Sequence, residues 1–484
     1  MPPGGTKMKL SVLTAHINAA PPAEDCEVTL ITDNSSKVCP GSVFVCIKGM
    51  HFDGHTKAAE ALRNGAVAVV VSHDLGLEKQ IIVENTRSAY TLLCSAFYGN
   101  PEKMLKIIGI TGTNGKTTTA FVISSSLEKM GYKTGMIGTV KNILGNGVEI
   151  PASLTTPDPF ELFSLFAQMV KNGCEYCVME VSSQALDQRR VDGIKFEAAV
   201  FTNLTQDHLD YHGTFENYKA AKHILFENTS IGIFNLDDEA AEYMMSSTDC
   251  RKVTYSASEN TCDYSAKNIK LSAGGVKYEL VSDNNIGRVN FKVPGKFSVY
   301  NSMCAVICLV EIGMDFSASV EAVSECQGVP GRMEIVETNT PYTVIIDYAH
   351  TPDSLENAIT TLKEVTAGRV IAVFGCGGDR DKTKRPIMGE IGTALADIAV
   401  ITSDNPRSED PQAIIDDILA GVPKHKHAKV IVEADRTAAI AKALSAAQEN
   451  DVVILAGKGH ETYQILSTGK IHYDEREVIA NILK

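Results

Sequence analysis

The sequence predicts an α/β protein of three domains, in which a nucleotide-binding core lies between two further α/β domains. The chain has 484 residues, and a domain commonly holds about 150 residues, so about three domains are expected. Short apolar runs typical of buried strands alternate with helical patterns along most of the chain. A glycine-rich turn stands directly between one such run and a helical segment, as in phosphate-binding sites. We place the domains at residues 1–105, 106–330 and 331–484.

The overall composition is that of an acidic globular protein. Lys and Arg number 45 against 59 Asp and Glu, a net charge of −14, and hydrophobic residues make up 44%. This charge argues against a nucleic-acid partner, because phosphate contacts need a basic face. No apolar run reaches the roughly 20 residues that membrane insertion requires, and the apolar centre of the N-terminal segment is short for a secretion signal. We therefore expect a cytoplasmic protein.

The 12 cysteines are expected to be reduced thiols, because the chain lacks an export signal. Cys174 and Cys177 form one C-x-x-C pair, and no second pair follows it. We interpret these two residues as buried thiols at the start of a strand rather than as a zinc or redox site.

The first domain is expected to mix short strands with helices. Its apolar runs are bounded by polar or glycine-containing segments, which is typical of buried strands. The predicted strands are Val43–Ile47, Ala66–Val71 and Gln80–Val83, and a helix is predicted over Tyr90–Phe97.

The second domain is expected to combine buried parallel strands with an antiparallel meander. From Lys252 to Pro294 the polarity alternates between turn sequences, which predicts the meander. A helix is predicted over Lys116–Met130, where Gly131 ends it. The predicted parallel strands are Lys106–Thr111, Tyr176–Val181 and Ala198–Leu204.

The third domain begins near Gly331 and is expected to be doubly wound and Rossmann-like, because strands and helical patterns alternate regularly. Its predicted strands are Thr343–Asp347, Val370–Phe374, Ile398–Thr402, Lys429–Val432 and Val452–Leu455.

The turn after Ile110 has the parts of a phosphate cradle. Backbone N–H groups and a helix N-terminus supply positive potential, Lys116 can bridge phosphates, and the Thr117 hydroxyl can hold Mg²⁺. The spacing departs from the standard phosphate loop, because two residues separate the glycines and Ile110 stands where an outer glycine is usual. A plain glycine turn is the alternative, but the flanking strand and helix favour a nucleotide. The predicted ATP-binding residues here are Gly112, Thr113, Asn114, Gly115, Lys116, Thr117 and Thr118.

This loop, together with further segments that follow it in the same order, resembles the Mur ligase family of ATP-dependent amide-bond synthetases. The resemblance covers nearly the whole chain and implies the three-domain architecture of that family, with a central ATPase domain. The further segments are Met179–Ser183, Asn203–Gly213, Gly331–Glu334, Asp347–Pro352, Phe374–Asp381, Asp404–Arg407 and Gly457–Glu461.

The resemblance implies ATP-dependent addition of meso-2,6-diaminopimelate to UDP-N-acetylmuramoyl-L-alanyl-D-glutamate, a step of peptidoglycan synthesis. A carboxylate does not condense with an amine in water, so ATP first converts it into an acyl phosphate, which the amine attacks. ATP and Mg²⁺ are the implied cofactors. A monomer without nucleic-acid partner or membrane insertion is expected.

The resemblance also implies a catalytic group consisting of Lys116, Glu180, His208 and Lys222. Glu180 and His208 follow apolar strands, and with Thr117 and Lys222 they are the implied Mg²⁺ ligands. Lys222 matches the family's carbamylated lysine, a long carboxylate made from an amine and carbon dioxide. Judged alone it would be read as a solvated helix lysine, and Lys219 is a weaker match for the same role.

The remaining implied residues belong to the sites of the three substrates. Those for the UDP-muramyl dipeptide are Ser35, Met50, His51, Phe52, Thr155, Thr156, Ser182, Gln188 and Arg190. Those that complete the ATP site are Asn301, Arg332 and Asp347. Those for diaminopimelate are Arg385, Asp404, Asn405, Pro406, Arg407, Gly457 and Glu461.

Arg407 decides the choice of amino acid within this resemblance. Meso-diaminopimelate has a carboxylate at its distal end that lysine lacks, and a guanidinium can bind a carboxylate through two parallel hydrogen bonds. The same segment without the resemblance would be read as a turn after a strand.

Three alternatives remain. The first is the L-lysine-adding ligase of the same step, which Arg407 disfavours. The second is a folate-polyglutamylating ligase, which the first domain and the run from His208 to Gly213 disfavour. The third is an ATPase switch of the phosphate-loop type that binds a partner without ligating anything.

Overall fold

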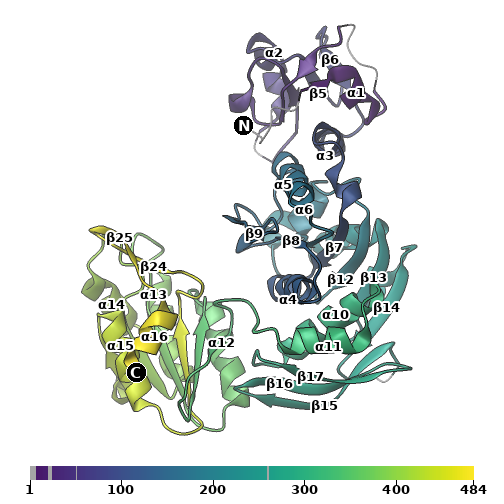
Figure 1. The fold of residues 1–484 in the computed structure, drawn as a ribbon. Helices are drawn as coiled ribbons and strands as arrows, with labels where there is room; N and C mark the ends of the chain where they lie inside the picture. The colour runs from purple at the N-terminus through teal and green to yellow at the C-terminus, as the bar shows by residue number, and fades with distance from the viewer. Residues whose placement is uncertain (1–6, 20–23, 51, 259–260) are drawn as a thin grey trace. The chain divides into compact units, whose positions relative to one another are not determined.

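The computed structural model describes residues 7–19, 24–50, 52–258 and 261–484. The chain forms two compact units. The first comprises Met1–Tyr264 and Cys304–Ser319, and the second comprises Ser265–Met303 and Val320–Lys484. Strands and helices alternate through both, which confirms the predicted α/β class (Figure 1).

The first unit begins with a four-stranded parallel sheet of order β3-β4-β5-β6. Its strands are β3 (Leu30–Thr32), β4 (Ser42–Val45), β5 (Ala68–Val71) and β6 (Gln80–Ile82). Phe44 and Val69 face one buried cluster while Val43 and Val70 face another, so both faces of the sheet are covered. Around it lie β1 (Met8–Lys9), α1 (Leu10–Ala15), β2 (Glu27–Val28), η1 (Ser35–Lys37), η2 (Gly54–Lys57), α2 (Ala58–Arg63), α3 (Thr86–Phe97) and η3 (Pro101–Met104).

The helix predicted from Tyr90 begins earlier, at Thr86. The Asn85 side chain accepts hydrogen bonds from the N–H groups of Arg87 and Ser88 at 3.0 and 3.1 Å. This side-chain cap supplies acceptors for the first turn, which an apolar pattern alone does not reveal.

A larger sheet in the same unit carries the phosphate loop. Its strands up to β14 follow the order β10-β9-β8-β11-β7-β12-β13-β14 and are parallel from β8 onward. Their bounds are β7 (Lys106–Thr111), β8 (Thr134–Ile137), β9 (Lys141–Ile143), β10 (Glu149–Pro151), β11 (Tyr176–Glu180), β12 (Phe196–Phe201), β13 (Thr229–Asn235) and β14 (Arg251–Ser256). Because β11 and β12 flank β7 in parallel, the carboxyl ends of these three strands meet at one edge.

Helices of the same segment follow the strands in sequence. They are α4 (Lys116–Lys129), α5 (Pro159–Lys171), α6 (Ser183–Asp187), α7 (Leu209–His212), α8 (Phe215–Glu227) and α9 (Ala241–Met245). Cys174 and Cys177 are buried free thiols beside β11, as predicted. Burial raises the pKa of both thiols.

Two predicted strands end or pair differently. The strand predicted over Ala198–Leu204 stops at Phe201, because Thr202 and Asn203 turn their hydrogen bonds to the phosphate loop. The meander predicted from Lys252 begins only at β15, because β14 pairs in parallel with β13.

The second unit holds the meander and a separate six-stranded sheet. The meander consists of β15 (Tyr264–Ser272), β16 (Gly275–Val281) and β17 (Ile286–Phe291), which are antiparallel. Helices α10 (Phe297–Glu311) and α11 (Phe316–Ser324) follow in sequence. The sheet has the order β18-β19-β23-β20-β21-β22 and is parallel except for β18.

The bounds of its strands are β18 (Glu334–Val336), β19 (Thr343–Asp347), β20 (Val370–Phe374), β21 (Ile398–Ile401), β22 (Val430–Val432) and β23 (Val452–Ala456), followed by the hairpin of β24 (Tyr463–Leu466) and β25 (Gly469–His472). The helices are α12 (Pro352–Val365), α13 (Lys384–Leu395), α14 (Pro411–Leu419), η4 (Lys424–Lys429), α15 (Arg436–Ala446) and α16 (Glu475–Ile482). Ile440 and Ile479 pack with the strand residues Val344 and Ile371 in one core. The strand order with its switch between β20 and β23 is typical of doubly wound sheets, whose sites lie at the carboxyl ends of the strands.

In the part of the chain that the structure describes, no helix combines the length and apolarity that crossing a membrane requires.

Candidate active site

The phosphate loop joins β7 to α4 and is shaped by two glycines. Gly112 has φ +148° and Gly115 has φ +86°, a region in which residues with a side chain are strained. A Cβ on Gly112 would lie 1.9 Å from Thr202 Oγ1. The Thr202 hydroxyl in turn donates to Asn114 O at 2.7 Å, so the end of β12 fixes the loop.

Two lysines converge on one carbonyl of this loop. Lys116 Nζ donates to Gly112 O at 2.9 Å, and Lys222 Nζ from α8 donates to the same oxygen at 2.8 Å. Lys222 is 1% exposed. Burial holds the pKa of Lys222 well below its ordinary value, and Lys116 lowers it further. Burial also lowers the pKa of Lys116, while Glu180 and Asp207 oppose that shift.

Glu180 ends β11 directly beside the loop. Its carboxylate accepts hydrogen bonds from Thr117 Oγ1 at 2.9 Å and from Thr139 Oγ1 at 3.0 Å on one oxygen, and from Thr139 N at 2.8 Å on the other. Mg²⁺ in nucleotide sites takes one or two carboxylates together with hydroxyl, water and phosphate oxygens. The adjacent Thr117 and Glu180 oxygens fit that donor set.

His208 is placed differently from the other implied metal ligands. Its side chain is 46% exposed and lies 3.6 Å from Asp207, and the residue has a positive φ of 51°. Across residues 7–19, 24–50, 52–258 and 261–484, no group of three or more His, Cys, Asp or Glu side chains is gathered as a metal site. The metal role of His208 therefore stays a prediction.

The residues predicted for the muramyl peptide gather next to Glu180. Thr156 Oγ1 donates to Glu180 O at 2.9 Å and accepts from Ser182 N at 3.0 Å. Arg190 donates to Thr156 O at 2.8 Å and, through its Nη2, to Gln188 Oε1 at 2.8 Å. Thr155 joins them by a hydrogen bond of 3.1 Å between its hydroxyl and that of Thr139. The structure thus brings the five predicted residues into one polar cluster, namely Thr155, Thr156, Ser182, Gln188 and Arg190.

Residues predicted for the uridine end lie on the small sheet. Ser35 begins η1, and His51 lies outside the described residues. Met50 and Phe52 are 73% and 54% exposed. Met50 lines a cavity of about 880 Å³ whose wall includes Arg87, Asp187 and Tyr211.

The residues predicted to complete the ATP site lie in the second unit. Asn301 is buried on α10. The Arg332 guanidinium lies 5.2 Å from the centre of the Tyr348 ring. Asp347 accepts from Met333 N and Ala349 N, both at 2.8 Å, and burial raises its pKa. Asp347 thus holds the segment that carries Arg332.

The pocket predicted for the amino acid lies at the carboxyl ends of β21 and β23. Asn405 Nδ2 donates to Glu461 Oε2 at 2.9 Å, and Pro406 is buried. The Asp404 carboxylate lies beside Gly457, whose φ is +117°. Arg436 ties the two strand ends together, because it donates to Ser403 O at 3.3 Å and to Ala456 O at 3.0 Å.

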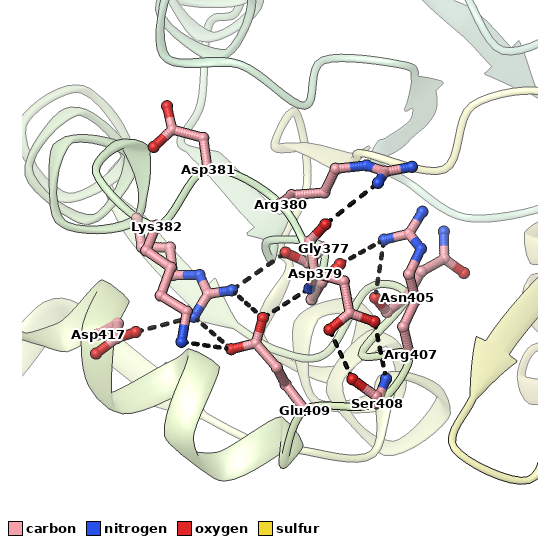
Figure 2. Close-up of polar contacts among 12 residues, drawn as sticks. Gly377, Asp379, Arg380, Asp381, Lys382, Asn405, Arg407, Ser408, Glu409 and Asp417 are labelled. Atoms are coloured by element: carbon pink, nitrogen blue, oxygen red, sulfur yellow. Dashed lines mark hydrogen bonds and ion pairs between the residues drawn. The ribbon is translucent and has the colours of Figure 1, made fainter.

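Arg407 stands in the loop after β21 with a positive φ of 53°. Its Nη1 donates to Gly378 O at 2.8 Å and to Asn405 O at 3.4 Å, and Figure 2 shows these contacts. Its backbone N–H donates to Ile465 O at 3.0 Å. Arg407 is therefore held by the protein and remains half-buried.

Arg385, which the resemblance implies for diaminopimelate, is already paired with carboxylates of the chain. Its guanidinium is fully buried and forms ion pairs with Glu409 and Asp417, each at 2.9 Å. Lys382 lies 3.1 Å from the same Glu409 carboxylate, and dashed lines in Figure 2 join Glu409 to its partners. The contact of Arg385 with diaminopimelate stays a prediction.

The Glu409 carboxylate gives an expected acid dependence of stability. Arg385, the Asp379 N–H and Lys382 lower its pKa from 4.5 to about 2. A lowered carboxyl pKa stabilises the fold above the ordinary pKa, and the contribution is lost as pH falls toward the folded value. The thermal midpoint of wild type should therefore exceed that of Glu409→Gln at pH 7, and the difference should shrink steadily from pH 4.5 toward pH 2. A difference that is constant over this range would contradict the ion pairs.

Several polar residues of the site were not predicted from the sequence. They are Thr139, Lys458, Glu409 and Arg436, and each has a contact with a residue distant in the chain. Of these four residues, only Lys458 could have been noticed in the sequence, because it lies in the segment Gly457–Glu461 that carries the family resemblance.

Family models match most of the chain. The model described as "Mur ligase family, catalytic domain" matches residues 27–98, "Mur ligase middle domain" matches 110–309, and "Mur ligase, glutamate ligase domain" matches 331–459.

Individual relatives agree over nearly the full length. A protein of Clostridium botulinum named UDP-N-acetylmuramoyl-L-alanyl-D-glutamate–2,6-diaminopimelate ligase is 48% identical over 95% of both chains. The protein of that name from Clostridium perfringens is 47% identical over 95% of this chain and 96% of its own. A solved structure of a ligase of the same name is 32% identical, covers 99% of both chains and superposes with a TM-score of 0.76.

Proposed function

Because the chain belongs to the Mur ligase family, we propose that it adds meso-2,6-diaminopimelate to UDP-N-acetylmuramoyl-L-alanyl-D-glutamate in peptidoglycan synthesis, as an ATP-dependent amide-bond-forming ligase. The observation that carries this proposal is the 48% identity, over 95% of both chains, to a ligase named for this reaction. ATP and UDP-linked precursors are cytoplasmic metabolites, so we place the enzyme in the cytoplasm.

The reaction needs two transfers at one site. An oxygen of the D-glutamate carboxylate attacks the γ-phosphorus of ATP, the bond to ADP breaks, and an acyl phosphate forms. The amine of the amino acid, after losing its proton, then attacks the acyl carbon, and inorganic phosphate leaves. Lys116 and the N–H groups of the loop before α4 are suited to hold the transferred phosphoryl group, because they present positive charge at the edge where β7 ends.

Thr117 and Glu180 would hold Mg²⁺, and we keep His208 and Lys222 as further candidate ligands. Such an ion supplies charge neutralisation at the phosphates. A buried lysine whose pKa is low carries a neutral amine, the form that reacts with carbon dioxide to give a carbamate and a proton. The environment of Lys222 therefore favours the carbamylated state.

We assign the substrates to the three predicted segments. Residues 1–105 with the cluster of Thr155, Thr156, Ser182, Gln188 and Arg190 would bind the UDP-muramyl dipeptide. Residues 106–330 would bind ATP, to which Asn301, Arg332 and Asp347 contribute. Residues 331–484 would bind diaminopimelate through the loops after β21 and β23.

Arg407 is expected to select diaminopimelate over L-lysine by at least about 100-fold in kcat/KM, because an unpaired cation in the pocket costs about 3 kcal/mol. In Arg407→Ala the rate with diaminopimelate should fall by a similar factor. Lysine use should stay low, because removing the arginine does not build a lysine pocket.

The proposed function is tested by offering both amino acids in one reaction with ATP and the dipeptide, and by separating the tripeptide products by mass. Equal incorporation of diaminopimelate and lysine by wild type would contradict the proposed choice of amino acid but not the proposed ligase activity. Absence of any tripeptide would contradict the ligase itself.

A further inference from the structure

Lys458 lies buried among the residues assigned to the amino acid, although no role was predicted for it. Its side chain is 0% exposed. Its ammonium donates to Asn405 Oδ1 at 3.1 Å and to Glu461 Oε2 at 3.2 Å, and it lies 3.6 Å from Asp404 Oδ1. A cation of the chain itself thus contacts three side chains that the family resemblance implies for diaminopimelate.

Four charged side chains at this position balance one another in charge, and two further cations, Arg332 and the exposed Lys470, lie over the neighbouring rings of Tyr348 and Tyr463. Asp404 and Glu461 carry two negative charges, and Lys458 and Arg407 carry two positive charges. Asp404, Glu461 and Arg407 all act on the hydroxyl of Tyr463, whose pKa burial raises, and the Lys458 ammonium lies 5.9 Å from the centre of the same ring. The next buried cation, Arg436, is matched by Glu475 at 2.8 Å.

One acceptor among these four side chains, the buried oxygen Asp404 Oδ1, has an ion-pair partner in Lys458 at 3.6 Å but accepts no hydrogen bond in the described part of the chain. A buried carboxylate oxygen is normally hydrogen-bonded, so an ammonium of the bound amino acid has a vacant acceptor there. The positively charged partner for the distal carboxylate of the amino acid is Arg407.

We propose that Lys458 is a specificity-determining residue: it makes the amino-acid pocket neutral, so that a distal group carrying both an ammonium and a carboxylate is accepted in preference to a lone ammonium. This inference rests on the proposed function. A neutral pocket that binds a zwitterionic group stays neutral, whereas a lone ion adds net charge to a buried site, which is costly. Without Lys458 the same side chains would carry one negative charge, so that a bound zwitterionic group would leave a buried charge unbalanced and the preference for it would fall.

The first test compares kcat/KM for diaminopimelate and for L-lysine in Lys458→Met, which keeps the length of the side chain and removes its charge. The ratio of the two values should fall at least about tenfold relative to wild type. The double variant Lys458→Met with Glu461→Gln restores neutrality, so its ratio should return most of the way to the wild-type value. A residue that only supports the fold would lower both values in parallel and leave the ratio unchanged.

Arg369→Met is the matched control. Arg369 pairs with Asp451 at 2.6 Å where β20 and β23 begin, which is the opposite edge of the sheet from the pocket. Its loss removes a partly buried cation from the same sheet and should leave the amino-acid ratio at the wild-type value. An unchanged ratio in folded Lys458→Met, together with normal tripeptide formation by wild type, would overturn this inference but not the proposed function.

The second test uses wild type alone, so it tests the neutrality of the pocket even if Lys458→Met does not fold. L-Lysine carries only the distal ammonium and 2-aminopimelate only the distal carboxylate. A neutral pocket should use both at least about 100-fold less well than diaminopimelate, and to within about tenfold of each other. If kcat/KM for lysine exceeds kcat/KM for 2-aminopimelate by more than about 100-fold, the pocket acts as a negatively charged site and the inference fails. If no amino acid yields a product, the proposed function itself fails.

Discussion

Lys116→Ala is expected to lose turnover by at least about a hundredfold while its fold is retained, because a charged contact to the transferring phosphoryl group contributes roughly 3 kcal/mol or more. The ammonium of Lys116 donates to Gly112 O and Thr113 O, both at 2.9 Å, so it lies within the loop that would hold the phosphates. Phosphate release and formation of tripeptide are the measurements.

Lys129→Ala is the matched control for this variant, because Lys129 is an exposed lysine at the other end of α4. It should keep the wild-type rate. Near-normal phosphate release by Lys116→Ala with a native melting curve would refute the role of the loop.

Lys222→Ala is expected to be nearly inactive, and short-chain carboxylic acids added to the reaction should restore part of the activity. The substitution leaves a space beside Gly112 O, and a small carboxylate in that space can imitate the carbamate. The measurement is the initial rate as a function of added acetate or propionate, at constant ionic strength.

Lys219→Ala supplies the comparison on the same helix. Its ammonium lies 4.7 Å from the centre of the Tyr243 ring and has no part in the proposed site, so its rate should match wild type with or without the acids. Full activity of Lys222→Ala without any addition would exclude the catalytic role of Lys222.

Apolar runs and turn residues predicted many of the buried parallel strands, because such strands are continuous apolar runs. The strands β3, β8 and β13 were not predicted. β7 and β19 have the predicted bounds. Where side-chain hydrogen bonds determine the end of a strand, the apolar pattern predicted the wrong end. The predicted extension of β12 to Leu204 is wrong, since Thr202 binds Asn114 O across the loop.

Residues in the site motifs were named from the sequence, whereas their partners were not. Arg385 was named as a diaminopimelate residue, whereas its partners Glu409 and Asp417 were not predicted. Lys458 contacts Asn405, which lies 53 positions earlier. Such pairings depend on which loops the sheet order brings together, and a single sequence contains no direct record of that order.

The most direct test of the ligase mechanism is phosphate release from ATP with each substrate omitted in turn. We expect release only when ATP, UDP-N-acetylmuramoyl-L-alanyl-D-glutamate and meso-diaminopimelate are all present, with one tripeptide formed for each phosphate. Steady release in the absence of the dipeptide or of diaminopimelate, without formation of an amide product, would contradict the ligase and favour an ATPase switch.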